Sequence, residues 1–174
     1  TQYAYFGIAM NDSPFFAANT HHPLAFVNNS IGSSSIQDNI TFGTSTEPAT
    51  TFTTADDAAQ HAGMIVPMLW YIPDAISIDS VIGIEGADNA TGDTTRMHLM
   101  SYTFTSGSTS ALTSGTLLAH NDDVTNAGSE QAYLSTFTVD SASVTAGKVI
   151  VALFRQDSTN SDYSLNMTVK YHLT

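Results

Sequence analysis

The chain is built of short runs in which apolar and polar residues alternate, and this pattern constrains its fold most strongly. The clearest run is the last one, where Leu165, Met167, Val169, Tyr171 and Leu173 alternate with polar residues. A period of two places successive side chains on opposite faces of a β-strand. The run therefore predicts a strand with one face on the core and the other toward water or a polar interface.

Further strand-like runs begin at residue 76. In "ISIDSVIGIE" the expected buried face comprises Ile76, Ile78, Ile82 and Ile84, and the opposite face Ser77, Asp79 and Glu85. "TTRMHLMSYTF" and "QAYLSTFTVD" predict two more strands. "GKVIVALFRQ" is apolar on both faces, which is typical of a central strand covered on each side by another sheet or by a partner subunit.

Strands at this spacing predict an all-β fold, an antiparallel β-sandwich or jelly roll. The helical signal is confined to "TTADDAAQHAG" at residues 53–63, which allows one or two turns. A length of 174 residues fits one domain. We expect residues 64–174 to form the jelly roll. Residues 1–63, with the aromatic patches "YAYFGIAM" and "SPFFAA", are expected to be an N-terminal arm or an extra strand layer that is not an independent domain.

Charge is sparse and one-sided. The chain has 16 acidic and 4 basic residues, a formal net charge of −12, and no Lys or Arg occurs before residue 96. Nucleic acids and anionic membrane surfaces are bound by clustered cations, so the composition argues against both partners. The longest apolar run, "MIVPMLWYIP", is too short to cross a bilayer. The absence of cysteine excludes disulfides, thiolate zinc sites and thiol nucleophiles.

Several polar clusters were weighed as metal sites. "THHPL" supplies His21 and His22, but neighbours on a strand point to opposite faces, so we expect a structural role for the pair. Three acidic loops supply the oxygen ligands that calcium prefers. Their candidate ligands are Glu85, Asp88, Asn89 and Asp93, then Asp122 and Asp123, then Asp157, Asn160 and Asp162. Asn and Asp also serve turns by bonding to nearby backbone N–H groups, and we expect that use, with a divalent ion at a subunit contact as the alternative.

No pattern of catalytic residues stands out. The chain lacks G-x-S-x-G, and Ser, His and Asp are too frequent for any triad to be singled out. We therefore predict a protein that is not an enzyme, without catalytic residues, metal or cofactor, and keep an acidic hydrolase as a remote alternative. Trp70 and Tyr71 could stack on a sugar ring if exposed, but their apolar surroundings predict burial in the core or an interface.

Arg155 is one of four basic residues and ends the run "KVIVALFRQ". It stands just before Asp157 and within plausible reach of Asp162. A guanidinium in this position can bridge carboxylates across the turn while its stem covers apolar surface. We therefore predict that Arg155 is a structural clamp and not an active-site residue.

The segments "WYIPDAISIDSVIGIEG", "RMHLMSYTF" and "STFTVDSASVTAGKVIVALFRQDSTNSDYSLNMTVKYHL" resemble the small β-jelly-roll modules of tailed bacteriophage virions. The shared features are an aromatic-Ile-Pro strand start at residues 70–73, a V-T-A-G-K turn, and an arginine before an Asp/Asn/Ser turn. The resemblance covers residues 64–174. These modules occur in capsid decoration (cement) proteins and in fibre tips.

The resemblance implies a non-enzymatic homotrimer on the outer capsid surface, which binds the major capsid protein and stabilises the shell. Fibre members of the family bind host receptors, so a receptor- or carbohydrate-binding module is the alternative. No coiled-coil heptads or repeats precede the module here, which favours decoration.

Overall fold

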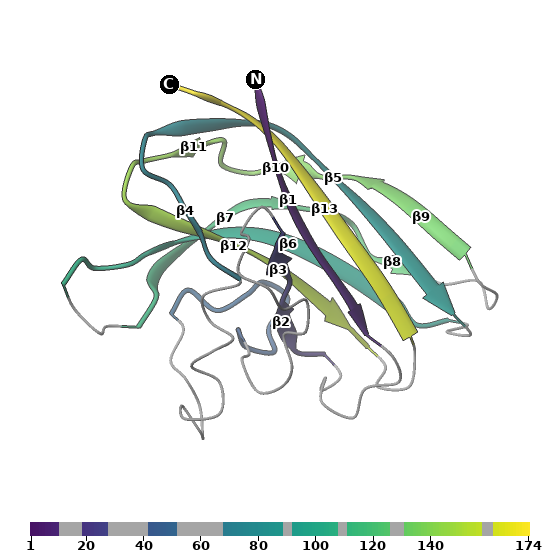
Figure 1. The fold of residues 1–174 in the computed structure, drawn as a ribbon. Helices are drawn as coiled ribbons and strands as arrows, with labels where there is room; N and C mark the ends of the chain where they lie inside the picture. Colours follow the sequence, from purple (N-terminus) through teal and green to yellow (C-terminus); the bar gives the residue numbers. More distant parts are fainter. Residues whose placement is uncertain are drawn as a thin grey trace.

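Every element that the structure describes is a β-strand, and the strands form two antiparallel sheets packed face to face (Figure 1). The computed structural model describes residues 1–10, 19–27, 42–51, 68–88, 92–107, 111–125, 131–157 and 162–174. The predicted antiparallel β-sandwich is confirmed. The helical turns expected at residues 53–63 lie outside the described residues. In the part of the chain that is described, no helix is long and apolar enough to span a membrane.

The first sheet, sheet A, has the strand order β11-β5-β13-β1-β3, and β9 also pairs with β5. Its strands are β1 (Gln2–Met10), β3 (Ala25–Phe26), β5 (Ile76–Asp88), β9 (Gln131–Thr136), β11 (Ser143–Val144) and β13 (Asp162–Leu173).

The second sheet, sheet B, has the order β10-β7-β6-β12-β2, with β4 beside β12 and β8 beside β6. Its strands are β2 (His21–Pro23), β4 (Trp70–Tyr71), β6 (Thr94–Thr103), β7 (Thr113–His120), β8 (Val124–Thr125), β10 (Thr138–Val139) and β12 (Lys148–Gln156).

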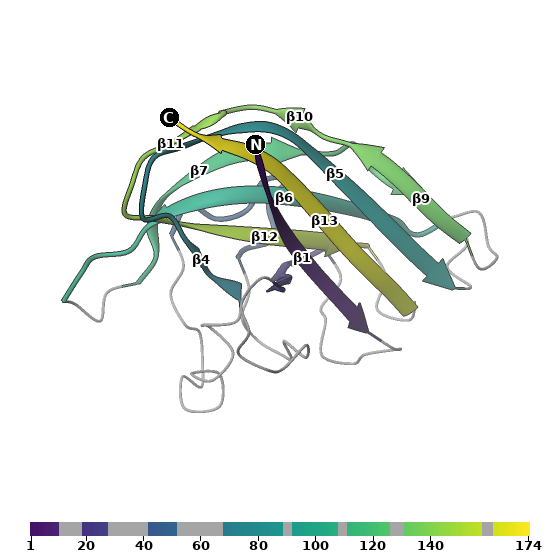
Figure 2. The ribbon, with the colours of Figure 1, turned by 45° about the horizontal axis from the view of Figure 1, so that its top comes forward.

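The connections between the long strands are those of a jelly roll. The chain passes from β5 in sheet A to β6 in sheet B, and later from β12 in sheet B back to β13 in sheet A. Each of these pairs bridges the sandwich instead of forming a hairpin within one sheet. The first and last strands are neighbours, with Gln2 opposite Tyr171, so the two termini lie at the same end of the molecule (Figure 2).

The N-terminal residues contribute strands to both sheets. We expected residues 1–63 to form an arm or an extra strand layer that is not an independent domain. The strand β1 lies between β13 and β3 in sheet A, and β2 pairs with β12 in sheet B. The described strands of this segment are therefore part of the sandwich, with Phe6 and Leu24 buried in its core and Tyr3 and Tyr5 exposed.

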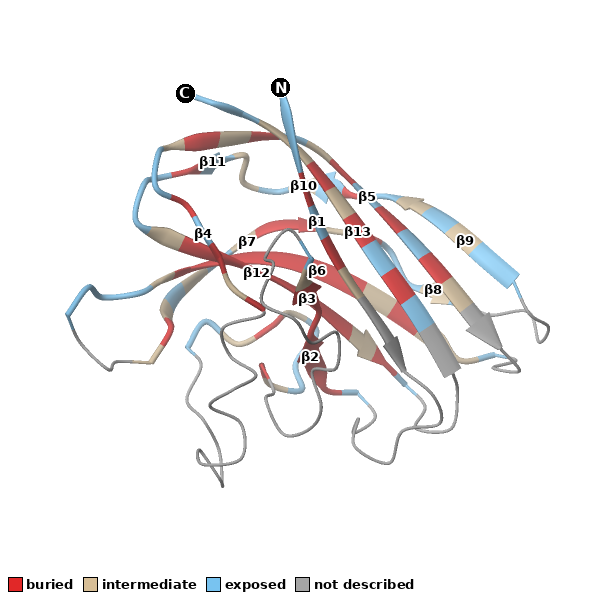
Figure 3. Cartoon of the chain, viewed as in Figure 1, coloured by how far each residue is buried: buried red, intermediate tan, exposed pale blue. Residues whose placement is uncertain are grey.

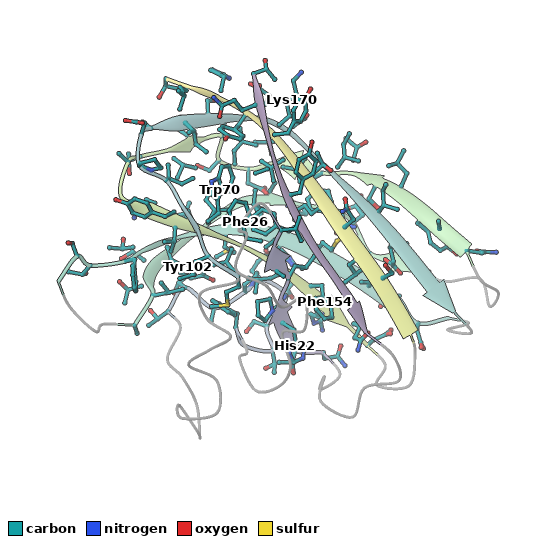
Figure 4. The ribbon with its side chains drawn as sticks, viewed as in Figure 1. His22, Phe26, Trp70, Tyr102, Phe154 and Lys170 are labelled. Carbon is teal, nitrogen blue, oxygen red and sulfur yellow. The ribbon has the colours of Figure 1, made fainter. Side chains whose placement is uncertain are left out.

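Aromatic side chains from both ends of the chain meet in the core. The Trp70 ring stacks on Phe26 at a centroid distance of 5.6 Å and meets Tyr171 edge-on at 4.9 Å (Figure 4). Phe6 of β1 approaches the same indole at 6.3 Å. Edge-on and offset contacts of this kind add to the stabilisation from burial itself.

The strands β6 and β12 of sheet B are buried on both faces over most of their length, as the sequence of β12 predicts. Ile150, Ala152 and Phe154 face sheet A, while Val151 and Leu153 point to the outer side and are equally buried. Figure 3 shows the resulting continuous burial along β6 and β12, in contrast to the alternation along β5 and β13.

A β-bulge in β5 changes which residues of this strand are buried. Lys170 pairs with Ser80 and Tyr171 with Ile78, so Asp79 has no partner in β13. One extra residue reverses the alternation beyond it. The predicted burial of Ile82 and Ile84 is therefore wrong, since both are exposed, and Glu85, expected at the surface, is buried.

We predict that Gly83→Ala destabilises the protein by about 1–3 kcal/mol through overpacking. A Cβ at Gly83 would lie 2.5 Å from Cε of Met97 and 2.8 Å from Cε1 of the Phe137 ring. The control is Gly86→Ala in the same strand, where the nearest atoms lie 3.8 Å away. Urea unfolding of both variants checks the prediction, and equal midpoints would contradict it.

Candidate functional site

The adjacent histidines His21 and His22 of β2 point to opposite faces of sheet B. The His22 ring lies in the core, 5.7 Å from the ring of Phe154 (Figure 4). The His21 ring lies on the outer face, 4.9 Å from the ring of His98. The two rings therefore cannot face one ion, as the alternation of a strand predicts.

Basic side chains gather on the outer face of sheet B. Arg96 of β6 stands opposite Arg155 of β12, and Arg155 stands opposite His21 of β2. His98, on the same face as Arg96, pairs with His120 of β7 at a ring distance of 6.4 Å. We call these five residues the His–Arg cluster. Two of the four Lys and Arg residues of an acidic chain thus lie side by side.

Residues 42–51, which we call the strap, lie over this outer face. At one end the backbone N–H of Phe42 donates to the carbonyl of His21 at 2.9 Å. At the other end the hydroxyl of Tyr102 on β6 donates to the carbonyl of Ala49 at 2.8 Å. The strap is therefore tied to β2 and to β6, on either side of the His–Arg cluster.

Glu47, in the middle of the strap, brings a carboxylate to the cluster. Its Oε1 lies 3.5 Å from Nη2 of Arg96, and its Oε2 lies 3.2 Å from Nε2 of His98. The contact with His98 lacks hydrogen-bond geometry. The side chain of Glu47 is 45% exposed, whereas that of His98 is fully buried. The ion pair therefore joins a partly exposed side chain, whose Oε2 atom is buried, to the guanidinium of Arg96 and the buried ring nitrogens of His98.

The two buried histidines are held neutral. Burial lowers the pKa of His98 to about 2, and the nearby His21 and Arg96 act in the same direction. Burial also lowers the pKa of His21, although the bond from its Nε2–H to the carbonyl of Ser45, at 2.8 Å, opposes the shift. The fixed positive charge of the cluster therefore resides on the two guanidinium groups.

Arg155 is a structural clamp, but its partner is not the one expected. Its Nη2 donates to Oδ1 of Asn19 at 2.8 Å, and its Nε donates to the backbone carbonyl of the same residue at 3.4 Å. Asn19 has a positive φ of 57° and lies two positions before the first residue of β2. The predicted bridge to Asp157 is wrong, because Asp157 accepts hydrogen bonds from N and Oγ1 of Thr94. Arg155 thus fixes the entry into β2.

Some candidate ligands of the acidic loops lie outside the described part of the chain, namely Asn89, Asn160 and the side chains of Asp88 and Asp162. Asp157 caps the start of β6 through Thr94, which is the turn chemistry that the sequence favours. Asp88 ends β5, Asp93 precedes β6, and Asp122 is exposed between β7 and β8. Over the described part of the chain, no three His, Asp or Glu side chains are grouped closely enough to hold a metal ion.

Glu85 is a carboxyl group buried between the two sheets. It faces Thr95 of β6, and Gln156, which pairs with Thr95, is buried beside it. Burial raises the pKa of Glu85 to about 7, and the Thr95 hydroxyl offsets part of this rise. Neither carboxyl oxygen reaches hydrogen-bond geometry with a partner. Glu85 therefore titrates near neutral pH inside the core.

Trp70 and Tyr71 are separated by the pleat of β4. Trp70 is 8% exposed and belongs to the aromatic core, while Tyr71 is 57% exposed. The expectation that Trp70 is buried is confirmed. The two rings therefore do not form a joint platform for a sugar.

Sequence reasoning missed Glu47 and His98, and it placed Glu85 on the wrong face. Glu47 and His98 are 51 positions apart in the sequence and meet only because the strap crosses β6. One usable signal was present: Arg96 and Arg155 both lie within apolar strands, whereas cations normally occupy surface positions. For Glu85, the flanking Gly83 and Gly86 indicated a strand with an irregular face.

Comparisons with known proteins leave the family open. No family model matches the chain, and no curated protein matches it. Among solved structures, it is similar to Eiger TNF from S. frugiperda, with a TM-score of 0.36 and 10% identity over 97% of this chain and 90% of the other. A similarity at this level carries no information about function.

We predict that Glu85→Gln removes a loss of stability that the native protein suffers between pH 4.5 and 7. The unfolded carboxyl releases its proton near pH 4.5, while the folded one keeps it until about pH 7, so folding becomes less favourable as the pH rises. The stability of the variant relative to the native chain should increase by roughly 3 kcal/mol from pH 4 to pH 8. Urea unfolding at both pH values measures this, and a difference independent of pH would refute it.

We predict the opposite pH dependence for His98. Its folded pKa lies below that of the unfolded histidine, so the native protein loses stability as the pH falls below 6.5. The melting temperature of His98→Gln should therefore fall less between pH 7 and pH 5 than that of the native chain. The effect of Glu85, which lies against the other face of sheet B, is common to both proteins. Equal losses would contradict the prediction, because they would mean that His98 binds protons alike in the folded and unfolded states.

Proposed function

We propose that this chain is a non-enzymatic structural protein of a bacteriophage virion, a decoration protein that forms a homotrimer on the outer capsid surface and stabilises the shell by binding the major capsid protein. The viral setting rests on the resemblance in residues 64–174. The observation that supports an assembly role is the group of exposed apolar side chains on the outer face of sheet A, where the described charged groups are Lys170 and Asp79, the latter bonded to His172.

This assembly face spans the strands β9, β5, β13 and β1. Its apolar members are Tyr3, Tyr5, Ile82, Ile84 and Leu134, and between them lie Thr136, Asn166, Thr168 and Lys170. Leu134 is 73% exposed and pairs directly with Ile84. Lys170 is the charged side chain among these residues (Figure 4). With strands about 4.8 Å apart and about 3.4 Å per residue, the face covers on the order of 400 Å².

Exposed apolar patches of this size are found at interaction surfaces more often than on the rest of a protein surface. The occupant we propose is a second copy of this chain. Copies that each carry a net charge of −12 repel one another, and they approach with less repulsion through the apolar centre of this face, where the nearest described carboxylate, that of Asp79, is paired with His172. Hydroxyl and amide groups between the apolar side chains can pair across such an interface.

We predict that Ile84→Lys lowers the oligomeric state, because it places a desolvated cation at the centre of the assembly face. The matched control is Phe104→Lys, since Phe104 is 43% exposed against 46% for Ile84 and lies after β6, outside this face. Size-exclusion chromatography with light scattering should give a trimer for the native chain and the control, and monomers for Ile84→Lys. A native monomer at micromolar concentration would contradict the proposal.

Binding to the shell is tested with capsids that lack the protein. A decoration protein binds them at a fixed stoichiometry, raises their resistance to heat, and gives no signal on a glycan array. Glycan binding without capsid binding would favour the receptor- or carbohydrate-binding alternative. That alternative now lacks the aromatic platform that first suggested it, since Trp70 is buried in the core.

A further inference from the structure

The His–Arg cluster concentrates positive charge in a chain that has little of it. Arg96 and Arg155 occupy directly opposed positions on neighbouring strands. Like charges at such positions repel, and here the surrounding strand residues are buried, which weakens screening by water. Among the residues whose side chains are described, Arg155 bonds to the neutral groups of Asn19 and pairs with no carboxylate. The arrangement therefore favours an anion beside these strands.

The anion described at this place is the carboxylate of Glu47, and its fit is loose. Its contact with Arg96 is long, at 3.5 Å, and its contact with His98 is 3.2 Å without hydrogen-bond geometry. Charge-assisted bonds between nitrogen and carboxylate are normally 2.7–2.9 Å. Glu47 is thus near the donors without satisfying them.

Donor capacity remains in the wall of the cluster. The Nε–H of Arg96 and the single N–H of the neutral His98 ring are buried and make no hydrogen bond within the described part of the chain. A guanidinium presents parallel N–H groups that match the two oxygens of a carboxylate. A cation is disfavoured at the same place by the two arginines, in agreement with the absence of a metal-binding group among the described residues.

We propose that Arg96 and His98 form a carboxylate-binding site on the outer face of sheet B, with Glu47 as its tethered ligand and small monocarboxylates as the free ligands that replace it. The Glu47 carboxylate reaches the site from the strap, not from the sheet, and its side chain is partly exposed. An incoming carboxylate therefore needs only the space of one side chain. The ion pair also holds the strap on β6, so occupancy of the site controls how firmly the strap is attached.

The test is rescue of Glu47→Ala by acetate. Removal of the carboxylate should lower the melting temperature in sodium chloride at pH 7, because the buried donors lose their anion. Sodium acetate at the same ionic strength should restore at least half of this loss, since a ligand that binds only the folded state stabilises it. The matched control is Asp140→Ala, because the Asp140 carboxylate bonds His120 at 2.8 Å without an arginine contact. Acetate should not restore that variant beyond its general effect on the native chain.

Two further variants keep the result decisive. Glu47→Gln retains the shape of the side chain and blocks the site, so acetate should not raise its melting temperature above the chloride value. Glu47→Ala combined with Arg96→Gln removes the guanidinium and should abolish the rescue. The ring ¹⁵N signals of His98 should shift with acetate in Glu47→Ala alone. Equal acetate effects on all variants, or a Glu47→Ala protein as stable as the native one, would overturn the proposal.

Discussion

The bulge at Asp79 is the constraint on which much of the molecule depends. One unpaired residue in β5 reverses the alternation of that strand, so Ile82 and Ile84 face outward while Val81 and Glu85 face the core. The Asp79 carboxylate is itself fixed by a 2.7 Å contact with Nδ1 of His172 on the neighbouring strand. The apolar assembly face and the buried carboxyl group therefore have a common origin.

The two sheets differ in what covers them. Sheet B is enclosed between sheet A and the strap, so polar groups on its outer face, such as His98, are desolvated and titrate far from their usual range. Sheet A has its outer face exposed over β5, β13 and β9 (Figure 3). The same desolvation acts on Glu85 with the opposite sign, because burial disfavours the charged form of an acid and of a base alike.

Local sequence patterns predicted well which segments form strands. They predicted less well what each strand packs against. The apolar run of β12 and the alternation of β13 identified a doubly covered strand and a half-covered one, since each pattern reports burial directly. The bulge could not be predicted, because Asp79 and Ser80 carry no Gly or other backbone signature there. The contacts of Glu47 with His98 and of Arg155 with Asn19 join distant segments, and periodicity within one run holds no information about such pairs.

The covering of sheet B also bears on how the chain can associate. If both outer faces were bare, a sandwich of this kind could stack through either sheet. Here the strap closes one face with hydrogen bonds to β2 and β6 and places an acidic residue over it. A second copy would bring its own excess of negative charge against that carboxylate on one side, whereas the exposed face of sheet A is apolar at its centre and carries Lys170. In the proposed assembly, association through sheet A is therefore favoured by both burial and charge, and the largely buried His–Arg cluster lies on the opposite sheet.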